Sequence, residues 1–315
     1  MPAAPIHCTG THGTQTLKEA AAHSCNPAFI TFGLQLGNEK FYEYMNDFGL
    51  MSGTGIDLDG EATGVFASPE SFTQLDLACY AFGQNFNVTP IALIAAQAAC
   101  VNGGYLHPPY LVEQIVDSDG SITYQHDNTP VRQVVSEETS AHVRECLEYV
   151  VSDGTGRNGQ VKGYRVGGKT GTSQKLDSEN ERARIASFVA VAPIENPKLA
   201  VLICLDEPHS WTTSGGALSG PVAAEVLQKS LPRLGIQPSY TEAEQAKYFT
   251  TVPDVTGWKA PAAAQKLSEY TLTADVLGQG ERVVSQYPRA GTTVRRGSAI
   301  QLDTTGQLDP AADDG

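Results

Sequence analysis

The sequence predicts an α+β domain followed by a second, smaller unit. In the first half of the chain, apolar residues recur at helical spacing, whereas 163–207 holds three successive strand-like runs. Helices first and strands in series afterwards are typical of an α+β domain. Beyond residue 251, a short strand, a helix and three short strands follow, which is enough chain for a small domain of its own.

Most of the expected helices carry a local start or stop signal. Thr16 and Glu19 form a capping box before an alanine run, and Gly37 ends the helix that follows Pro27. Pro27 in a first helical turn predicts that Asn26 is the N-cap and lies outside the right-handed helical region. The expected helices of the first domain cover 16–23, 27–36, 40–49, 70–83, 89–101, 136–153 and 220–231.

The expected strands are marked by short apolar runs between turn residues. Asp119 and Gly120 predict a hairpin. The runs 163–174, 184–193 and 198–207 have short connections, which predicts an antiparallel meander. Gly220 and Pro221 are expected to begin the helix that follows the meander.

Four segments follow from this reading. Residues 1–234 form the first domain, 235–250 a linker, 251–304 the small domain and 305–315 a disordered tail. Charges nearly cancel within the small domain, so the acid excess lies mainly in the first domain.

The overall charge excludes some classes of function. A formal net charge of -14 over 315 residues argues against nucleic-acid binding, which needs a basic face.

The longest apolar run, Leu199–Leu205, is far too short to span a membrane. Six cysteines without a C-x-x-C pair do not read as a disulfide framework and are expected to pack as small hydrophobes.

A basic window lies inside this acidic chain. No Asp or Glu occurs from Gly154 to Leu176, whereas five Lys or Arg do. Lys169, Thr170 and Gly171 fall on the first strand of the meander, where cationic and hydroxyl donors suit a carboxylate. Gly171 lacks a Cβ and lets a ligand approach the backbone. The alternative is a turn at 167–168 with a solvated lysine. A lone K-T-G is a moderate signal, because it occurs by chance in about a few per cent of chains.

The stretch Ser24-Cys25-Asn26 has little weight alone, since an S-x-N triplet occurs by chance roughly once in a chain of this length. S-x-N followed by K-T-G about 145 residues later is a more specific signal than either triplet alone. The two motifs accompany S-x-x-K in penicillin-binding proteins and class A β-lactamases. The context quoted in "HGTQTLKEAAAHSCNPAFI", "GTGIDLDGEATG", "AFGQNFNVTPIAL", "NGGYLHPP" and "GGKTGTSQK" resembles the class B penicillin-binding proteins over most of 6–230.

The smaller unit resembles a PASTA module through "VPDVTGW" and "VVSQYPRAGTTVRRGSAIQL". One such module behind a transpeptidase domain is similar to sporulation and division enzymes of Gram-positive bacteria. The resemblance therefore implies the penicillin-binding transpeptidase fold and a peptidoglycan D,D-transpeptidase. It implies a stem peptide ending in D-Ala-D-Ala as substrate, β-lactams as ligands, an extracytoplasmic location with an N-terminal membrane anchor, and no cofactor or metal.

Site roles are carried over by the same resemblance. Ser24 would relay a proton to the leaving amine, Asn26 would hold a substrate amide, and Lys169 would supply positive potential and a hydrogen bond to Ser24. Thr170 and Thr172 would bind the terminal carboxylate. The backbone N–H of Thr172 would be one oxyanion donor.

The family nucleophile is the serine of S-x-x-K, and no serine in this sequence has a lysine three residues on. The chain is therefore expected to be a C-terminal fragment that is inactive by itself, with the nucleophile and any anchor upstream of Met1. A serine β-lactamase shares the two triplets but is not expected to carry a PASTA module. A third hypothesis is a non-catalytic cell-wall-binding module that acts through the PASTA unit.

Histidines and cysteines cluster in sequence beside Ser24, at His7, Cys8, His12, His23 and Cys25. Their composition suits zinc, but their spacing fits no standard site. A disulfide between Cys8 and Cys25, with redox control of the Ser24 loop, is an alternative, and packed thiols are the third interpretation.

Overall fold

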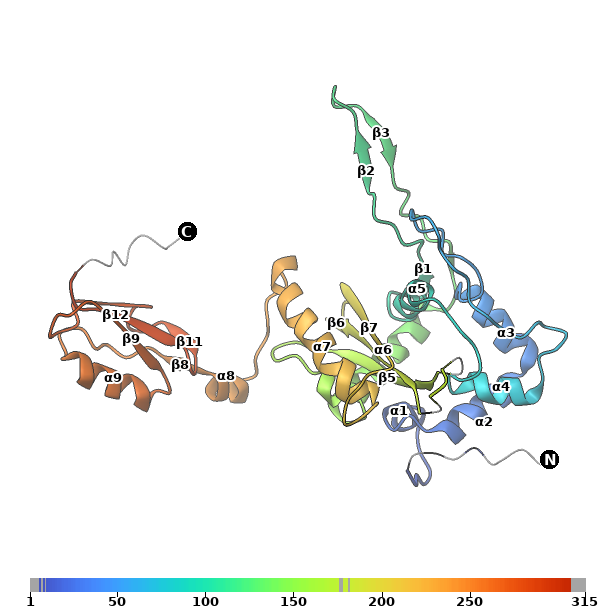
Figure 1. Ribbon diagram of the computed structural model, residues 1–315, viewed down its shortest axis with the longest axis horizontal. Helices are drawn as coiled ribbons and strands as arrows, with labels where there is room; N and C mark the ends of the chain where they lie inside the picture. The colour runs from blue at the N-terminus through green and yellow to red at the C-terminus, as the bar shows by residue number, and fades with distance from the viewer. Residues whose placement is uncertain (1–5, 7, 9, 176–177, 181, 307–315) are drawn as a thin grey trace. The chain divides into compact units, whose positions relative to one another are not determined.

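The computed structural model describes residues 6, 8, 10–175, 178–180 and 182–306. Its contacts divide the chain into two compact units, Met1–Pro238 and Ser239–Gly315. Helices and antiparallel strands build the first unit, which confirms the α+β class (Figure 1). In the described part of the chain, no helix is long and apolar enough to cross a membrane.

The helices of the first unit follow the expected order. They are α1 (Leu17–Ala22), α2 (Asn26–Leu36), α3 (Asn38–Asp47), α4 (Gln74–Ala81), α5 (Pro90–Val101), α6 (Glu137–Ser152) and α7 (Gly215–Ser230), with the 3-10 turns η1 (Arg157–Gly159) and η2 (Pro232–Leu234). The capping box of Thr16 and Glu19 is present, and Ser136 caps α6. Helix α4 is shorter than expected because a second capping box, Thr73 with Asp76, starts it later.

Two of the expected helix starts are wrong. Helix α2 takes Cys25 as N-cap, and Asn26 already lies in the helix, because the chain turns one residue earlier at Ser24. Helix α7 begins at Gly215 rather than Gly220, so that Pro221 lies inside it. Gly215 and its small neighbours are buried, and Gly215 lies against backbone atoms of the sheet, which places the start of the helix there. Pro221 lacks the N–H for one helix hydrogen bond.

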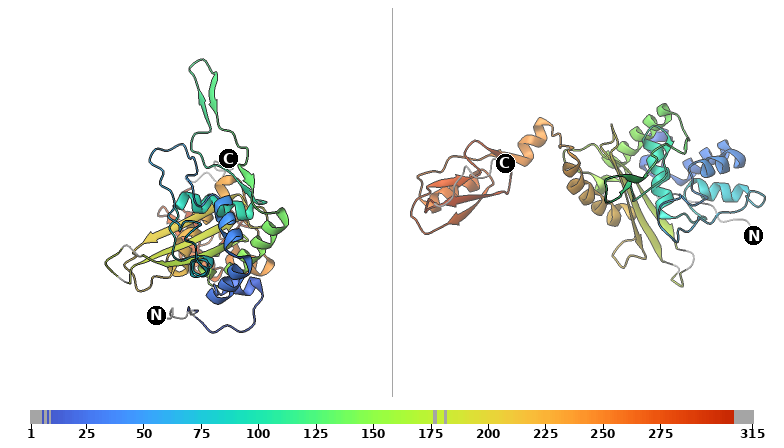
Figure 2. Two further views of the ribbon diagram at one scale, coloured as in Figure 1. Left: turned by 90° about the vertical axis from the view of Figure 1, so that its right-hand side faces the viewer. Right: turned by 90° about the horizontal axis from the view of Figure 1, so that it is seen from above.

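The central sheet is the antiparallel meander that the sequence predicts. Its strands β5 (Gly167–Gln174), β6 (Arg184–Ala192) and β7 (Leu199–Asp206) lie in that order. Lys169 faces Val189 across the β5–β6 ladder, and Thr170 faces Phe188. Helix α7 covers one face of this sheet, and α5 and α6 contact it from the other (Figures 1 and 2).

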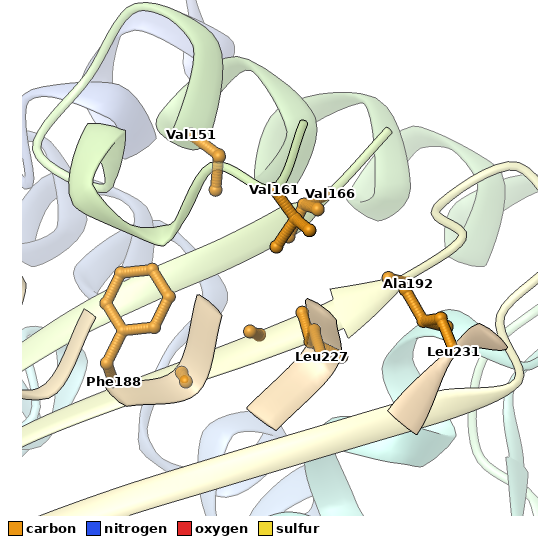
Figure 3. Close-up of a cluster of buried hydrophobic side chains, with 9 residues drawn as sticks. Val151, Val161, Val166, Phe188, Ala192, Leu227 and Leu231 are labelled. Atoms are coloured by element: carbon orange, nitrogen blue, oxygen red, sulfur yellow. The ribbon is translucent and has the colours of Figure 1, made fainter. Parts of the chain in front are cut away.

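The main core lies between α7 and the sheet. Phe188 points into it from β6 and is fully buried (Figure 3). The buried members of this cluster are Val151, Val161, Val166, Phe188, Ala190, Ala192, Ala223, Leu227 and Leu231. A second cluster on the opposite face includes Val189, the partner of Lys169 across the ladder, so alternation along β5 assigns Lys169 and Thr170 to opposite faces.

Two small sheets complete the first unit. The expected hairpin forms from β2 (Gln114–Val116) and β3 (Ile122–Gln125), which expose all their residues. The pair of β1 (Tyr105–Leu106) with β4 (Arg132–Gln133) was not expected, because two-residue strands carry too little pattern to be read.

The second unit has its own buried cluster, which includes Val255, Leu267 and Ile300. Its elements are α8 (Glu242–Tyr248), β8 (Phe249–Thr251), α9 (Ala260–Glu269), β9 (Thr273–Leu277), β10 (Ser285–Tyr287), β11 (Thr293–Arg295) and β12 (Ala299–Asp303). Strand β11, which pairs with β8, is one more than expected, and α8 lies in the range read as linker. From residue 307 on, the expected tail lies outside the described residues.

Candidate functional site

The Ser24 corner is a tight turn between α1 and α2. Ser24 adopts a left-handed backbone conformation with φ of 52°, which is uncommon for a residue other than glycine. The turn is held by backbone hydrogen bonds from Ser24 N–H to the carbonyl of Ala21 (3.2 Å) and from Cys25 N–H to that of Ala20 (3.0 Å). A strained residue kept in place by its surroundings is frequent at functional sites.

The turn after α6 docks onto α1 beside this corner. A Cβ on Gly154 would lie 2.6 Å from the carbonyl oxygen of Ala22, so only glycine permits this approach. The next residue, Thr155, donates its backbone N–H to the same carbonyl at 3.0 Å. The end of α6 therefore fixes α1, and with it Ser24, relative to the sheet.

Lys169 reaches Ser24 from strand β5. Its ammonium donates to Ser24 Oγ at 2.8 Å and to the carbonyl oxygen of Thr170 at 3.0 Å. Thr170 Oγ1 lies 3.5 Å from the same nitrogen, at the outer limit of a hydrogen bond. The two residues that the sequence placed in separate motifs thus share one hydrogen bond.

Burial changes the protonation of this lysine. Removal from water disfavours the charged ammonium and lowers the pKa of Lys169 from 10.5 to about 8. Its hydrogen bonds within the described residues all go to neutral oxygens, so no carboxylate offsets this cost. Lys169 therefore remains mostly charged at neutral pH, and a bound anion can balance its charge.

Two threonine hydroxyls lie along the same strand. Thr172 Oγ1 accepts a hydrogen bond from the backbone N–H of Gly215, the first residue of α7, at 3.1 Å. Because that contact uses a lone pair, the hydroxyl hydrogen of Thr172 can still be donated. Thr170 Oγ1 lies 3.3 Å from Thr155 Oγ1. Together with Lys169, these groups can donate several hydrogen bonds to a carboxylate.

The basic window is more neutral than its composition indicates. Arg165 makes a bidentate ion pair with Glu148 at 2.7 Å, and Lys175 contacts Asp206 and Glu207. These carboxylates stand outside the window in sequence but beside it in space. Two of the five cations of the window are therefore paired with carboxylates, whereas the hydrogen bonds of Lys169 go to neutral oxygens.

The sequence did not identify Thr155 as a site residue, although it lies in the acid-free window. Only folding shows that its hydroxyl approaches Thr170. For Gly171, an added Cβ would meet Ser187 Oγ, a side-chain atom that can rotate away, so packing on β6 does not by itself require a glycine there. Whether a ligand also needs that space stays a prediction, as do the roles of Ser24, Asn26, Lys169, Thr170 and Thr172.

The start of α7 offers a test of how the fold holds the site. A Cβ on Gly215 would meet the carbonyl oxygens of Gly171 and Ser187, which are backbone atoms that cannot rotate away. We expect Gly215→Ala to lower the free energy of unfolding by about 3 kcal/mol, measured by urea denaturation. Gly13→Ala is the matched control, because nothing lies within 4 Å of its added Cβ. Equal stability of the two variants would contradict this packing.

A second group of side chains gathers near the Ser24 turn. The structure brings together Cys8, His12 and Cys25, and the ring of His23 stacks on that of His12. His7 lies outside the described residues. The cysteines, Cys8 and Cys25 included, form no disulfide within the described chain.

Comparisons with known proteins agree with both units. The profile of the family described as "Penicillin binding protein transpeptidase domain" matches residues 6–228, and that of the PASTA domain matches 250–306. The chain is similar to stage V sporulation protein D of Bacillus subtilis, with 40% identity over 97% of this chain and 48% of that protein. It is also similar to the peptidoglycan D,D-transpeptidase FtsI homolog of Mesostigma viride, with 28% identity over 71% of this chain and 40% of that protein.

Among solved structures, penicillin-binding protein 3 of Mycobacterium tuberculosis in complex with ampicillin is similar, with a TM-score of 0.69 and 26% identity. That similarity covers 75% of this chain and 55% of the other. The chain spans less than half the length of the two curated relatives it matches here.

Proposed function

Because the chain belongs to the penicillin-binding protein transpeptidase family, we propose that it contributes one side of a peptidoglycan D,D-transpeptidase site. The observation that carries the proposal is the 2.8 Å hydrogen bond from Lys169 to Ser24. The reaction is acyl transfer through a serine ester. The donor is a stem peptide ending in D-Ala-D-Ala, and the acceptor is an amine on a neighbouring peptidoglycan strand. The process takes place outside the cytoplasmic membrane, in a protein anchored to it.

In the acylation step, the nucleophilic serine forms an ester with the penultimate D-Ala carbonyl, and the amide bond to the terminal D-Ala breaks. The lysine of the S-x-x-K motif takes up the hydroxyl proton of the nucleophilic serine. Ser24 gives its own hydroxyl proton to the departing nitrogen and is reprotonated from that lysine. Because the Lys169 ammonium occupies a lone pair of Ser24 Oγ, the Ser24 O–H is directed away from Lys169. Asn26 holds the amide of the substrate.

The terminal carboxylate is bound by strand β5 and its neighbours. Lys169 supplies the positive charge, and the hydroxyls of Thr170 and Thr172 donate to the carboxylate oxygens. The backbone N–H of Thr172 contributes to the oxyanion hole, together with the N–H of the nucleophilic serine. β-Lactams present a carboxylate and a strained amide in a similar arrangement, and the Mycobacterium tuberculosis relative was solved with ampicillin.

The nucleophile gives the direct test of this proposal. We expect the 315-residue chain to form no covalent adduct with penicillin, because it holds no S-x-x-K serine. Intact-mass spectrometry after incubation measures this, and a stoichiometric adduct would show that another residue of this chain acts as the nucleophile. A longer form of the protein that includes an S-x-x-K motif is expected to gain one penicillin per chain.

Turnover of the same longer form separates a transpeptidase from a β-lactamase. A transpeptidase site is expected to keep the acyl group, so that nitrocefin is consumed about once per chain. Rapid, continued nitrocefin hydrolysis would assign the protein to the β-lactamases.

A further inference from the structure

A pocket beside the Ser24 turn is lined by the N-terminal segment and the start of α2. The ligand atoms of Cys8, His12 and Cys25, which all line it, lie within 4.8 Å of one another. Cys8 Sγ and His12 Nδ1 are 3.5 Å apart. A thiol–imidazole hydrogen bond explains that one contact but not the second sulfur, which either a disulfide with Cys8 or a shared metal ion would bring to this point. Both cysteines are free thiols in the structure.

These distances suit a tetrahedral metal ion. With Zn–S near 2.3 Å and Zn–N near 2.0–2.1 Å, ligand atoms of a tetrahedral zinc site lie roughly 3.5–3.8 Å apart. The Cys8–His12 distance already has this value. The other pairs lie within 4.8 Å and need to close by at most about 1.3 Å to reach the same spacing. Cys8 and His12 lie outside regular helices and strands, so small movements of their segment can supply it.

The donor set selects the kind of metal. Two sulfurs and one imidazole are soft to borderline ligands, which favour zinc over magnesium or calcium. Cys25 is the N-cap of α2 and is only 5% exposed. Its side chain makes no capping hydrogen bond to the helix, so capping does not prevent the sulfur from binding a metal. The positive end of the helix favours a negative charge at that position.

The histidine of the cluster is held in position by its neighbours. The ring of His12 stacks on that of His23, with centroids 4.8 Å apart and planes within 8°. His23 in turn lies 2.7 Å from Gln15 Oε1 through Nδ1. Such outer contacts orient metal-binding imidazoles in general. His12 would bind through Nδ1 and keep its proton on Nε2.

We propose that Cys8, His12 and Cys25 bind one zinc ion, with the fourth position open to the pocket. Both thiols release their protons to solvent on binding, and the histidine binds as the neutral imidazole. Since Cys25 directly follows Ser24, the ion ties the N-terminal segment to the backbone of the Ser24 turn. This metal site is separate from the acyl-transfer chemistry proposed above and does not depend on it.

Cobalt(II) titration of the 315-residue chain in a non-thiol reductant tests the site. We expect one cobalt per chain, with a thiolate-to-cobalt charge-transfer band and tetrahedral d–d bands, and displacement of cobalt by one equivalent of zinc. Cys8→Ser and His12→Asn should each weaken cobalt binding by more than the roughly 10- to 100-fold that loss of an outer-shell partner costs. Cys204→Ser is the control, because this exposed thiol is not part of the cluster and should leave binding unchanged.

Two further measurements keep the test decisive. Thiol titration establishes that all six cysteines are reduced. This control is needed because a disulfide between Cys8 and Cys25 would itself prevent metal binding. Hydrogen exchange at residues 8–26 should slow on zinc addition in the parent chain but not in Cys8→Ser. Absence of the thiolate band in fully reduced chain, or its full retention in Cys8→Ser, would overturn the proposal.

Discussion

Replacing Lys169 by methionine is expected to slow acylation by penicillin by about 10²- to 10³-fold in a form of the protein that carries the S-x-x-K serine. Methionine keeps most of the side-chain volume but removes the donor to Ser24 and the charge that faces the substrate carboxylate. The second-order rate constant of acylation, measured by stopped-flow or by quenched intact-mass spectrometry, checks this expectation.

The matched control is Lys162→Met, because Lys162 lies in the same basic window but is exposed. This variant should acylate at nearly the parental rate. An unchanged rate in Lys169→Met would remove this lysine from the site, whereas equal losses in both variants would point to a general electrostatic effect.

The same substitution changes how stability depends on pH, and this can be measured on the 315-residue chain itself. The pKa of Lys169 falls from 10.5 to about 8 on folding, so between these values the unfolded chain binds more protons than the folded one. Below pH 8, the folded protein bears the full cost of burying the charged ammonium. As the pH increases toward 10.5, the free energy of unfolding rises by up to about 3 kcal/mol. Lys169→Met should abolish this rise in urea unfolding experiments. A parallel pH dependence in parent and variant would contradict the assigned burial.

Phe188→Ala is expected to lower the free energy of unfolding of the first unit by about 3–5 kcal/mol. The ring is fully buried between α7 and the sheet, and it contacts a cluster whose members come from several segments (Figure 3). An added Cβ on Gly159 or Gly168 would also press on this ring, so the surrounding backbone is packed closely against it. Removal of the ring leaves a cavity that fixed backbone cannot fill. Calorimetry or urea unfolding measures the loss.

Phe32→Ala is the matched control for this substitution, because Phe32 is 39% exposed on α2. Its loss should be about 1 kcal/mol, since little of a cavity forms at a partly solvated position. The transition of the second unit, which has its own core, serves as an internal reference. Similar losses for the two phenylalanines would show that the cluster does not dominate the stability of the first unit.

The family resemblance is confirmed by the match over residues 6–228, and it rested on local context rather than on the triplets alone. Helix caps such as Ser136 and stop signals such as Gly37 were read correctly, because each depends on a few adjacent residues. The starts of α2 and α7 were read wrongly. In both cases a proline was taken as the first turn, while the actual start was set by a turn at Ser24 and by glycines that pack on the sheet.

Local sequence patterns were enough to predict the α+β class, the order and type of the main elements and the two motifs, because capping, periodicity and turn chemistry depend on neighbouring residues. The family resemblance implied a hydrogen bond between Lys169 and Ser24, and the fold brings these residues together across 145 positions. Tertiary structure alone decided that Thr155 approaches Thr170. It also decided that Arg165 and Lys175 are paired with carboxylates, since these carboxylates come from other segments of the chain. Such contacts depend on how the faces of distant elements pack together, and no local pattern records that packing.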